Sequence, residues 1–331
     1  MTAPAAPGVD AAYYADQQRI LRTAVNQAQA AWAQLPARGS GPRAWQDEVR
    51  PQVVAAIEQA QIDSAALAPL YVAGTLAAAG AVSAPLATLV AGAFAGYAAT
   101  GLTLPVLVDF AYTYYRRAAA LDVPPSEAHA LGLARLLRYV ATETADAGRL
   151  ASTAAAIVEP EIAGYERIVH LPACGRCIQL AGRVYRYSTG FERHPQCECG
   201  MKAITREQWR TIRRDNNPRA LFDRMTPAQQ DKAFGKGDAA AIRAGADISR
   251  VVNARRKGAV YTAGGHEYTH EATTVRGVGR QLGELSKRPG SRYRTSGVVR
   301  PTAAQLVDTA RDENELIDQL RRFGYLRDGA P

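Results

Sequence analysis

All four cysteines of this 331-residue chain fall within one short stretch, and a histidine lies among them. Cys174 and Cys177 are separated by two residues, and His194 and Cys197 repeat that spacing after sixteen more residues. Two such pairs can surround one point with thiolates and an imidazole, the tetrahedral arrangement of a structural zinc. We therefore predict a closed Zn²⁺ site of Cys174, Cys177, His194 and Cys197, with Cys199 as a substitute ligand or a buried thiol. Disulfides and thiols without a metal are the alternatives.

The residues between the two halves of this cluster have the length of a hairpin. Val184-Tyr185-Arg186-Tyr187 favours a strand, and Gly182 and Gly190 bracket it as turn residues. We therefore expect a small zinc-ribbon-like hairpin. Four protein ligands would leave no open position on the ion, so we expect the metal to stabilise the fold without doing chemistry.

A second motif has the pattern of zinc metalloproteases. His266, Glu267 and His270 match H-E-x-x-H, in which two histidines one helical turn apart bind zinc and the glutamate is the general base. Two glycines directly precede the motif, and threonines at 269, 273 and 274 favour a strand. On a strand the two histidines would stand about 13 Å apart, too far to share one ion. We expect residues 261–275 to be extended, and a protease is only an alternative hypothesis.

Charge divides the chain into two parts. Residues 1–159 carry 10 basic and 12 acidic side chains, whereas residues 160–331 carry 30 basic and 19 acidic ones, a net +11. A basic module indicates contact with a polyanion such as nucleic acid. The N-terminus lacks a basic region followed by an apolar run, so we expect synthesis in the cytoplasm. The candidate residues for contact with nucleic acid are Arg255, Arg256, Lys257, Arg276 and Arg280.

The element pattern predicts a mainly α protein, with a helical N-terminal domain (1–159) followed by a smaller α+β domain (160–331) that contains the ribbon. Apolar residues recur at helical spacing over 10–35 and over 44–63, where Pro51 kinks or restarts the helix. Residues 64–108 carry no charged side chain and are rich in Ala and Gly. We expect a tightly packed helical hairpin there, and membrane contact is the alternative.

Cap residues mark the helices of the second half. Thr226 with Pro227 predicts a helix over 228–234, and Asp238 and Asp247 predict helices over 239–243 and 248–255. A polar helix is expected over 205–213. A last helix is expected over 302–323, ended by Gly324. Three short helices joined through glycine can imitate a helix-turn-helix, so a zinc-ribbon nucleic-acid-binding protein is a further alternative.

Several stretches of the second half together resemble the Mu F-like minor capsid, or head morphogenesis, proteins of tailed bacteriophages, especially those of actinobacteriophages. The resemblance covers about residues 145–331, and the stretches that carry it are 172–177, 180–182, 184–187, 190–199, 225–230, 240–247, 251–256 and 320–326.

The resemblance implies a structural, non-enzymatic virion protein made in the host cytoplasm and placed near the portal inside the head. The implied partners are portal, capsid or scaffold proteins and packaged double-stranded DNA, bound without sequence preference. Some proteins of the family are described as capsid maturation proteases, which keeps the alternative role for His266, Glu267 and His270 open.

Overall fold

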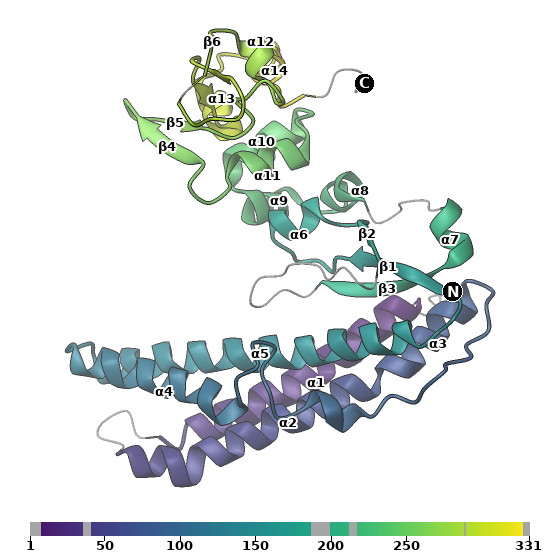
Figure 1. Cartoon of the computed structure of the whole chain (residues 1–331). Helices are drawn as coiled ribbons and strands as arrows, with labels where there is room; N and C mark the ends of the chain where they lie inside the picture. Colours follow the sequence, from purple (N-terminus) through teal and green to yellow (C-terminus); the bar gives the residue numbers. More distant parts are fainter. Residues whose placement is uncertain (1–7, 36–40, 187–198, 212–216, 288, 327–331) are drawn as a thin grey trace, which may run out of the picture. The chain divides into compact units, whose positions relative to one another are not determined.

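The computed structural model describes residues 8–35, 41–186, 199–211, 217–287 and 289–326. Contacts divide the chain into two compact units. The N-terminal unit holds residues 1–168 and 183–213, and the C-terminal unit holds residues 169–182 and 214–331. Both are mainly helical with small antiparallel sheets, which confirms the predicted mainly α class (Figure 1). The charge of the chain changes after residue 159, whereas the first segment of the N-terminal unit continues to residue 168.

Long helices build the N-terminal unit. In chain order they are α1 Val9–Trp32, the π-helix η1 Ala44–Val49, α2 Arg50–Ala66, α3 Ala68–Ala78, α4 Leu104–Ala120 and α5 Pro125–Ile157. The first three confirm the helices expected over 10–35 and 44–63. Pro51 lies in the first turn of α2, directly after the π-helix, and Val49 and Arg50 keep helical dihedral angles through the junction. The π-helix therefore ends and α2 begins just before this proline.

An aromatic cluster packs α1, η1, α4 and α5 together. The ring of Trp32 meets those of Trp45 and Tyr115 edge to face, with centroids 5.7 and 6.0 Å apart. Gly132 on α5 faces them, and a Cβ there would lie 2.6 Å from the Trp32 ring. The indole N–H of Trp45 donates to Asp109 at 2.6 Å. A glycine at this point of α5 is thus a requirement of packing, because any side chain would displace the indole.

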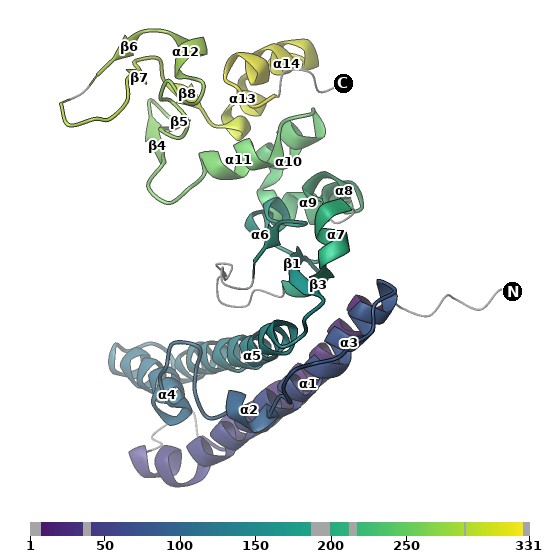
Figure 2. The ribbon, with the colours of Figure 1, turned by 45° about the vertical axis from the view of Figure 1, so that its right-hand side comes forward.

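The predicted helical hairpin over 64–108 is wrong in its second half. After α3 the chain continues as an irregular segment, residues 79–103, which we call the strap; its one short helix is the 3-10 turn η2 Ala91–Phe94. Gly80, Gly96 and Gly101 have positive φ values of 74°, 86° and 84°, which end helical structure. Both ribbon views show the strap running along the helices of this unit (Figures 1 and 2). Among the described residues, no helix combines the length and apolarity that a membrane crossing needs.

A three-stranded antiparallel sheet completes the N-terminal unit. Its strands are β1 Ile162–Ile168, β2 Val184–Tyr185 and β3 Gly200–Thr205, in the order β2-β1-β3. Tyr165 pairs with Tyr185, and their rings stack with centroids 5.4 Å apart. The strand expected at 184–187 therefore pairs with β1, upstream of the cysteines, and the described residues do not form the predicted ribbon hairpin. Short helix α7 Arg206–Thr211 follows β3, within the range expected.

Short helices and strands make up the C-terminal unit. The helices are α6 Gly175–Gln179, α8 Pro218–Asp223, α9 Pro227–Phe234, α10 Lys236–Arg243, α11 Ile248–Ala254, α12 Gly279–Leu282, α13 Ala303–Thr309 and α14 Glu313–Arg322. The strands are β4 Val260–Ala263, β5 His266–Thr269, β6 Leu285–Ser286, β7 Thr295–Ser296 and β8 Arg300–Pro301, in sheets of order β4-β5-β8 and β6-β7.

The caps of these helices agree with the sequence in two cases and differ in two. Thr226 forms a full capping box with Gln229, and the Asp247 carboxylate accepts from the Arg250 N–H. The predicted cap at Asp238 is wrong, because α10 begins two residues earlier and buries this carboxylate. The single helix predicted over 302–323 is also wrong: Thr302 caps α13, and Asp312 caps a separate α14.

Candidate functional sites

The described cysteines are divided between the two units. Cys174 and Cys177 lie at the N-cap and in the first turn of α6, in the C-terminal unit, and Cys177 is buried. Cys199 is buried just before β3, in the N-terminal unit. His194 and Cys197, the other predicted ligands, lie outside the described residues. Within the described ranges, no group of three or more His, Cys, Asp or Glu side chains comes together as metal ligands would.

Two arginines surround Cys199 within the N-terminal unit. Arg149 Nε donates to its carbonyl at 2.8 Å, and a terminal nitrogen of Arg167 lies 3.5 Å from its sulfur. Asp146 forms an ion pair with Arg149, and all three charged residues are buried. A buried guanidinium is stable only with such partners, and the contacts of Arg149 and Arg167 fix Cys199 in position. Sequence reasoning missed both arginines because they lie 32 and 50 residues before Cys199.

The H-E-x-x-H motif lies on a strand. His266, Glu267 and Thr269 belong to β5, which confirms the expected extended backbone. Both histidines are exposed, and the His270 ring stacks on Tyr261 with centroids 4.3 Å apart. The Glu267 carboxylate forms an ion pair with Arg255 at 2.9 Å. The helical turn that brings two histidines of this motif onto one ion is absent at these residues.

A buried ion cluster joins several elements of the C-terminal unit. Asp238 on α10 is 3% exposed, forms an ion pair with Arg255 and accepts from the backbone N–H of Ala304 at 3.0 Å. Burial raises the pKa of Asp238, and Arg255 opposes that rise. Burial alone would lower the pKa of Arg255, but the carboxylates of Asp238 and Glu267 raise it. The cluster therefore ties α10, α11, α13 and β5 to one another.

A buried cation, Arg300, lies elsewhere in this unit. Arg300 on β8 is 2% exposed and donates to the backbone carbonyls of Phe323 and Glu271, both at 2.9 Å. Its guanidinium stacks over the Tyr325 ring at 4.1 Å. Burial lowers the pKa of Arg300 and raises that of Tyr325 to about 12. Arg300 thus fastens the C-terminal end of α14 to the β4-β5-β8 sheet.

The five candidate residues for contact with nucleic acid fall into two groups. Arg255 is engaged in the ion cluster, and Arg256 forms an ion pair with Glu271 at 3.5 Å. Lys257, Arg276 and Arg280 are exposed, and Arg276 also lies over the Tyr293 ring at 4.4 Å. The second group is therefore the better placed to reach a phosphate backbone.

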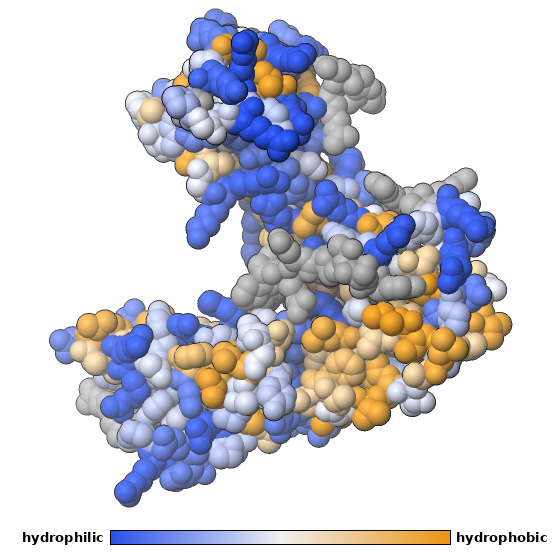
Figure 3. Space-filling model, viewed as in Figure 1, coloured by the Kyte–Doolittle hydropathy of each residue, from blue (hydrophilic) through white to orange (hydrophobic). Residues whose placement is uncertain are grey.

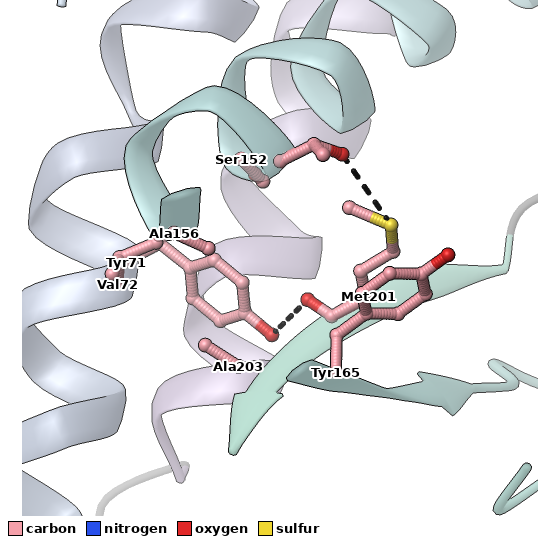
Figure 4. Close-up of a pocket in the computed structure, with 8 residues that line it drawn as sticks. Tyr71, Val72, Ser152, Ala156, Tyr165, Met201 and Ala203 are labelled. Atoms are coloured by element: carbon pink, nitrogen blue, oxygen red, sulfur yellow. Dashed lines mark hydrogen bonds between the residues drawn. The ribbon is translucent and has the colours of Figure 1, made fainter. Parts of the chain in front are cut away.

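A small cavity in the N-terminal unit lies between α3, α5 and the sheet. Figure 4 shows it between Tyr71, Tyr165 and Met201, where the Tyr71 hydroxyl donates to the Met201 carbonyl at 2.9 Å. Its volume is about 10 Å³, room for one water molecule. Burial raises the pKa of Tyr71 well above its usual value, and Asp10 adds to that rise. The cavity is a packing feature of the sheet on the helices and is too small for a substrate.

The strap is the functional candidate that sequence reasoning did not find. Three polar side chains of the helical core hold its backbone. Glu159 accepts from the Ser83 hydroxyl and from the Ala84 N–H, and Glu143 accepts from the Ala99 N–H at 2.8 Å. The Gln61 amide accepts from the Gly96 N–H at 3.0 Å and donates to the Tyr97 carbonyl at 2.9 Å. The strap is therefore an ordered surface element, held near its start at residues 83–84 and near its end at residues 96–99.

Large apolar side chains of the strap face away from the core. Ala81, Leu89 and Phe94 pack inward, whereas Val82, Leu86, Val90 and Tyr97 are between 63% and 81% exposed. In Figure 3, hydrophobic residues gather over the part of this unit where Figure 1 shows the segment after α3. We call Val82, Leu86, Val90 and Tyr97 the strap patch.

The comparisons with known proteins give no relative: no family model, no curated protein and no solved structure matches this chain.

Proposed function

We propose that this chain is a structural protein of the head of a tailed bacteriophage, of the Mu F-like minor capsid type. It would assemble beside the portal, inside the head, through protein contacts of its N-terminal unit. Its basic C-terminal unit would face packaged double-stranded DNA and bind it without sequence preference.

The observation that carries the proposal is where the resembling stretches lie. Stretches 225–230, 240–247, 251–256 and 320–326 supply the Thr226 capping box, the Asp247 cap and the core residues Ile242, Val251 and Leu320. They are far apart in sequence, yet they belong to one packed unit. Stretches 172–177 and 180–182 lie in the same unit, whereas strand β2 of the stretch 184–187 belongs to the N-terminal unit. A resemblance spread over most of one packed unit supports a structural role more than a likeness confined to one short motif would.

Contact with DNA rests on exposed cations of the C-terminal unit. Lys257, Arg276 and Arg280 are exposed, and the C-terminal unit, residues 169–182 and 214–331, carries 22 basic and 14 acidic side chains, a net charge of +8. Cations of this kind displace counterions from phosphates, so affinity would fall steeply with salt and be insensitive to sequence.

The particle itself offers the test of this proposal. Mass spectrometry of purified, DNA-filled particles from the phage that encodes the chain should detect it at a few copies, well below the major shell protein. Particles treated with protease before disruption should retain it, because an interior protein is shielded by the shell. Its absence from purified particles, or its loss on protease treatment, would contradict an interior head protein.

The proposal includes a structural Zn²⁺ held by Cys174, Cys177, His194 and Cys197, with Cys199 as the alternate ligand. Cys174 and Cys177 fit half of such a site, because they are three residues apart at the start of α6, where side chains are neighbours. Elemental analysis should find about one zinc per chain. The double variant Cys174→Ser, Cys177→Ser should lose it, whereas Cys199→Ser should keep it. Equal zinc in the double variant and the native protein would refute the site.

A further inference from the structure

The strap patch exposes more apolar side chain than ordinary surface positions need. Val82 and Leu86 are 80% and 81% exposed, and Val90 follows four residues later at 68%. Single exposed apolar residues are common, but several within nine residues, on a face also rich in alanine, form the type of patch that marks protein association.

The strap is ordered before any partner arrives. Glu159, Gln61 and Glu143 are 4%, 1% and 5% exposed, and each gives its polar groups to the strap backbone. Buried polar side chains are stable only with such bonds, so the helical core and the strap depend on each other. A surface already fixed loses little conformational entropy on binding, which favours association.

The charge pattern restricts what can cover the patch. Residues 64–108 carry no charged side chain, so the strap offers no ion pair to a charged partner. Peripheral membrane surfaces combine apolar residues with Lys or Arg that meet anionic lipid, and the strap has no Lys or Arg. A matching surface must therefore be apolar and uncharged, and the same strap on a second copy of this chain has both properties.

The lack of charge and the length of the strap are also compatible with a two-fold contact between two copies. In a two-fold contact the same surface lies on both sides, so any charged residue near the axis would meet its like. The strap avoids this repulsion because it has no charge. Its length, residues 79–103, is comparable with the roughly 20–30 residues that each side of a standard interface contributes.

We infer that the strap patch is a self-association surface through which two copies of this chain pair, strap against strap. The inference is independent of the proposed function, since pairing through the patch can be measured on the purified chain whether or not it occurs in particles.

Sedimentation velocity of the full chain over about 1–100 µM tests the inference, because that range brackets micromolar dimers. The native protein should change from monomer to dimer with concentration. Leu86→Glu and, separately, Val82→Lys should each weaken the dimer by at least about thirty-fold, since either places an unpaired charge in an apolar contact. Both positions are about four-fifths exposed, so these variants should keep the native helical circular dichroism.

The matched control is Leu121→Glu. Leu121 is 77% exposed, and it follows the far end of α4, whose 17 residues span about 25 Å from the end of the strap. It should dimerise like the native protein. A native chain that stays monomeric throughout the range would overturn the inference. So would equal effects of Leu86→Glu and Leu121→Glu, or a monomeric native chain that sediments with phosphatidylcholine vesicles and is released by Leu86→Glu, which would make the occupant lipid.

Discussion

Buried polar side chains serve different elements in the two units of this protein. In the N-terminal unit long helices already share an apolar core. There the buried Glu159, Gln61 and Glu143 hold an irregular segment on the surface, and one group of buried charges, Asp146, Arg149 and Arg167, gathers at Cys199 beside the sheet. In the C-terminal unit the helices are mostly four to ten residues long, and buried charges hold the framework itself. Asp238 with Arg255, and Arg300 with Tyr325, connect elements that would otherwise share little apolar area.

This difference follows from helix length. A helix of 24 or 33 residues, as in α1 and α5, can present an apolar stripe over many turns and bury it against several neighbours. A helix of seven residues, such as α11 or α13, has two turns and few core positions. Caps and directed ion pairs therefore contribute a larger share of its stability. The comparison predicts that loss of Asp238 or Arg300 unfolds structure in the C-terminal unit, whereas loss of the side chains that hold the strap only loosens the surface of the N-terminal unit.

The largest effect is expected at Arg300. Arg300→Ala removes a buried cation and leaves the carbonyls of Phe323 and Glu271 without their donor, at a cost of about 3–5 kcal/mol. Arg300→Lys keeps the charge but cannot reproduce the planar fork, so its cost should be smaller, about 1–2 kcal/mol. Hydrogen exchange of the full chain in a urea series would measure both, through the amides of α14 and of β5, the strand that pairs with β8.

The control for this prediction is Arg311→Ala. Arg311 is a surface residue whose side chain is 85% exposed and paired with Glu315 four residues on. Exchange in α14 should not change measurably in this variant. Equal exchange in Arg300→Ala and Arg311→Ala would show that the C-terminal unit does not depend on its buried cation, and the contrast between the units would fail.

Sequence reasoning succeeded where a signal was local. The periodic apolar residues of α1, the restart at Pro51, and the caps Thr226 and Asp247 each depend on residues within a few positions of one another. Asp238 shows the limit of such signals. It stands directly before an alanine run and has the type of an N-cap, but the carboxylate is taken by Arg255, 17 residues further on. Tertiary pairing overrode the local preference.

The strap and the cysteine stretch escaped prediction for a related reason. Alanine and glycine carry almost no periodic hydrophobic signal, so residues 79–103 were compatible with a helix, and their anchors at 61, 143 and 159 lie elsewhere in the chain. Spacing alone placed the strand at 184–187 in a ribbon, whereas its partner β1 precedes the cysteines. Residues that are close in sequence were thus assigned to one local element although their contacts lead to different units.

A smaller effect is expected at Gln61, and it addresses the other half of the comparison. Gln61→Leu leaves the Gly96 N–H and the Tyr97 carbonyl without the amide that pairs them, which should destabilise the later part of the strap, around residues 95–98, by about 2–3 kcal/mol. Leucine has a similar size and a good helix propensity, so α2 itself should remain intact. Hydrogen exchange should therefore rise about thirty-fold or more for residues 95–98 and stay unchanged in α2 and α5.

Gln52→Leu is the matched control, because Gln52 lies on the same helix but is exposed and bonds only to Gln34 and to the preceding turn. It should leave strap exchange at the native rate. If Gln61→Leu does the same, the inward side chains Leu89 and Phe94 must hold the strap instead. If exchange rises through the whole N-terminal unit, the buried amide supports the framework, and the two units use polar groups in the same way after all.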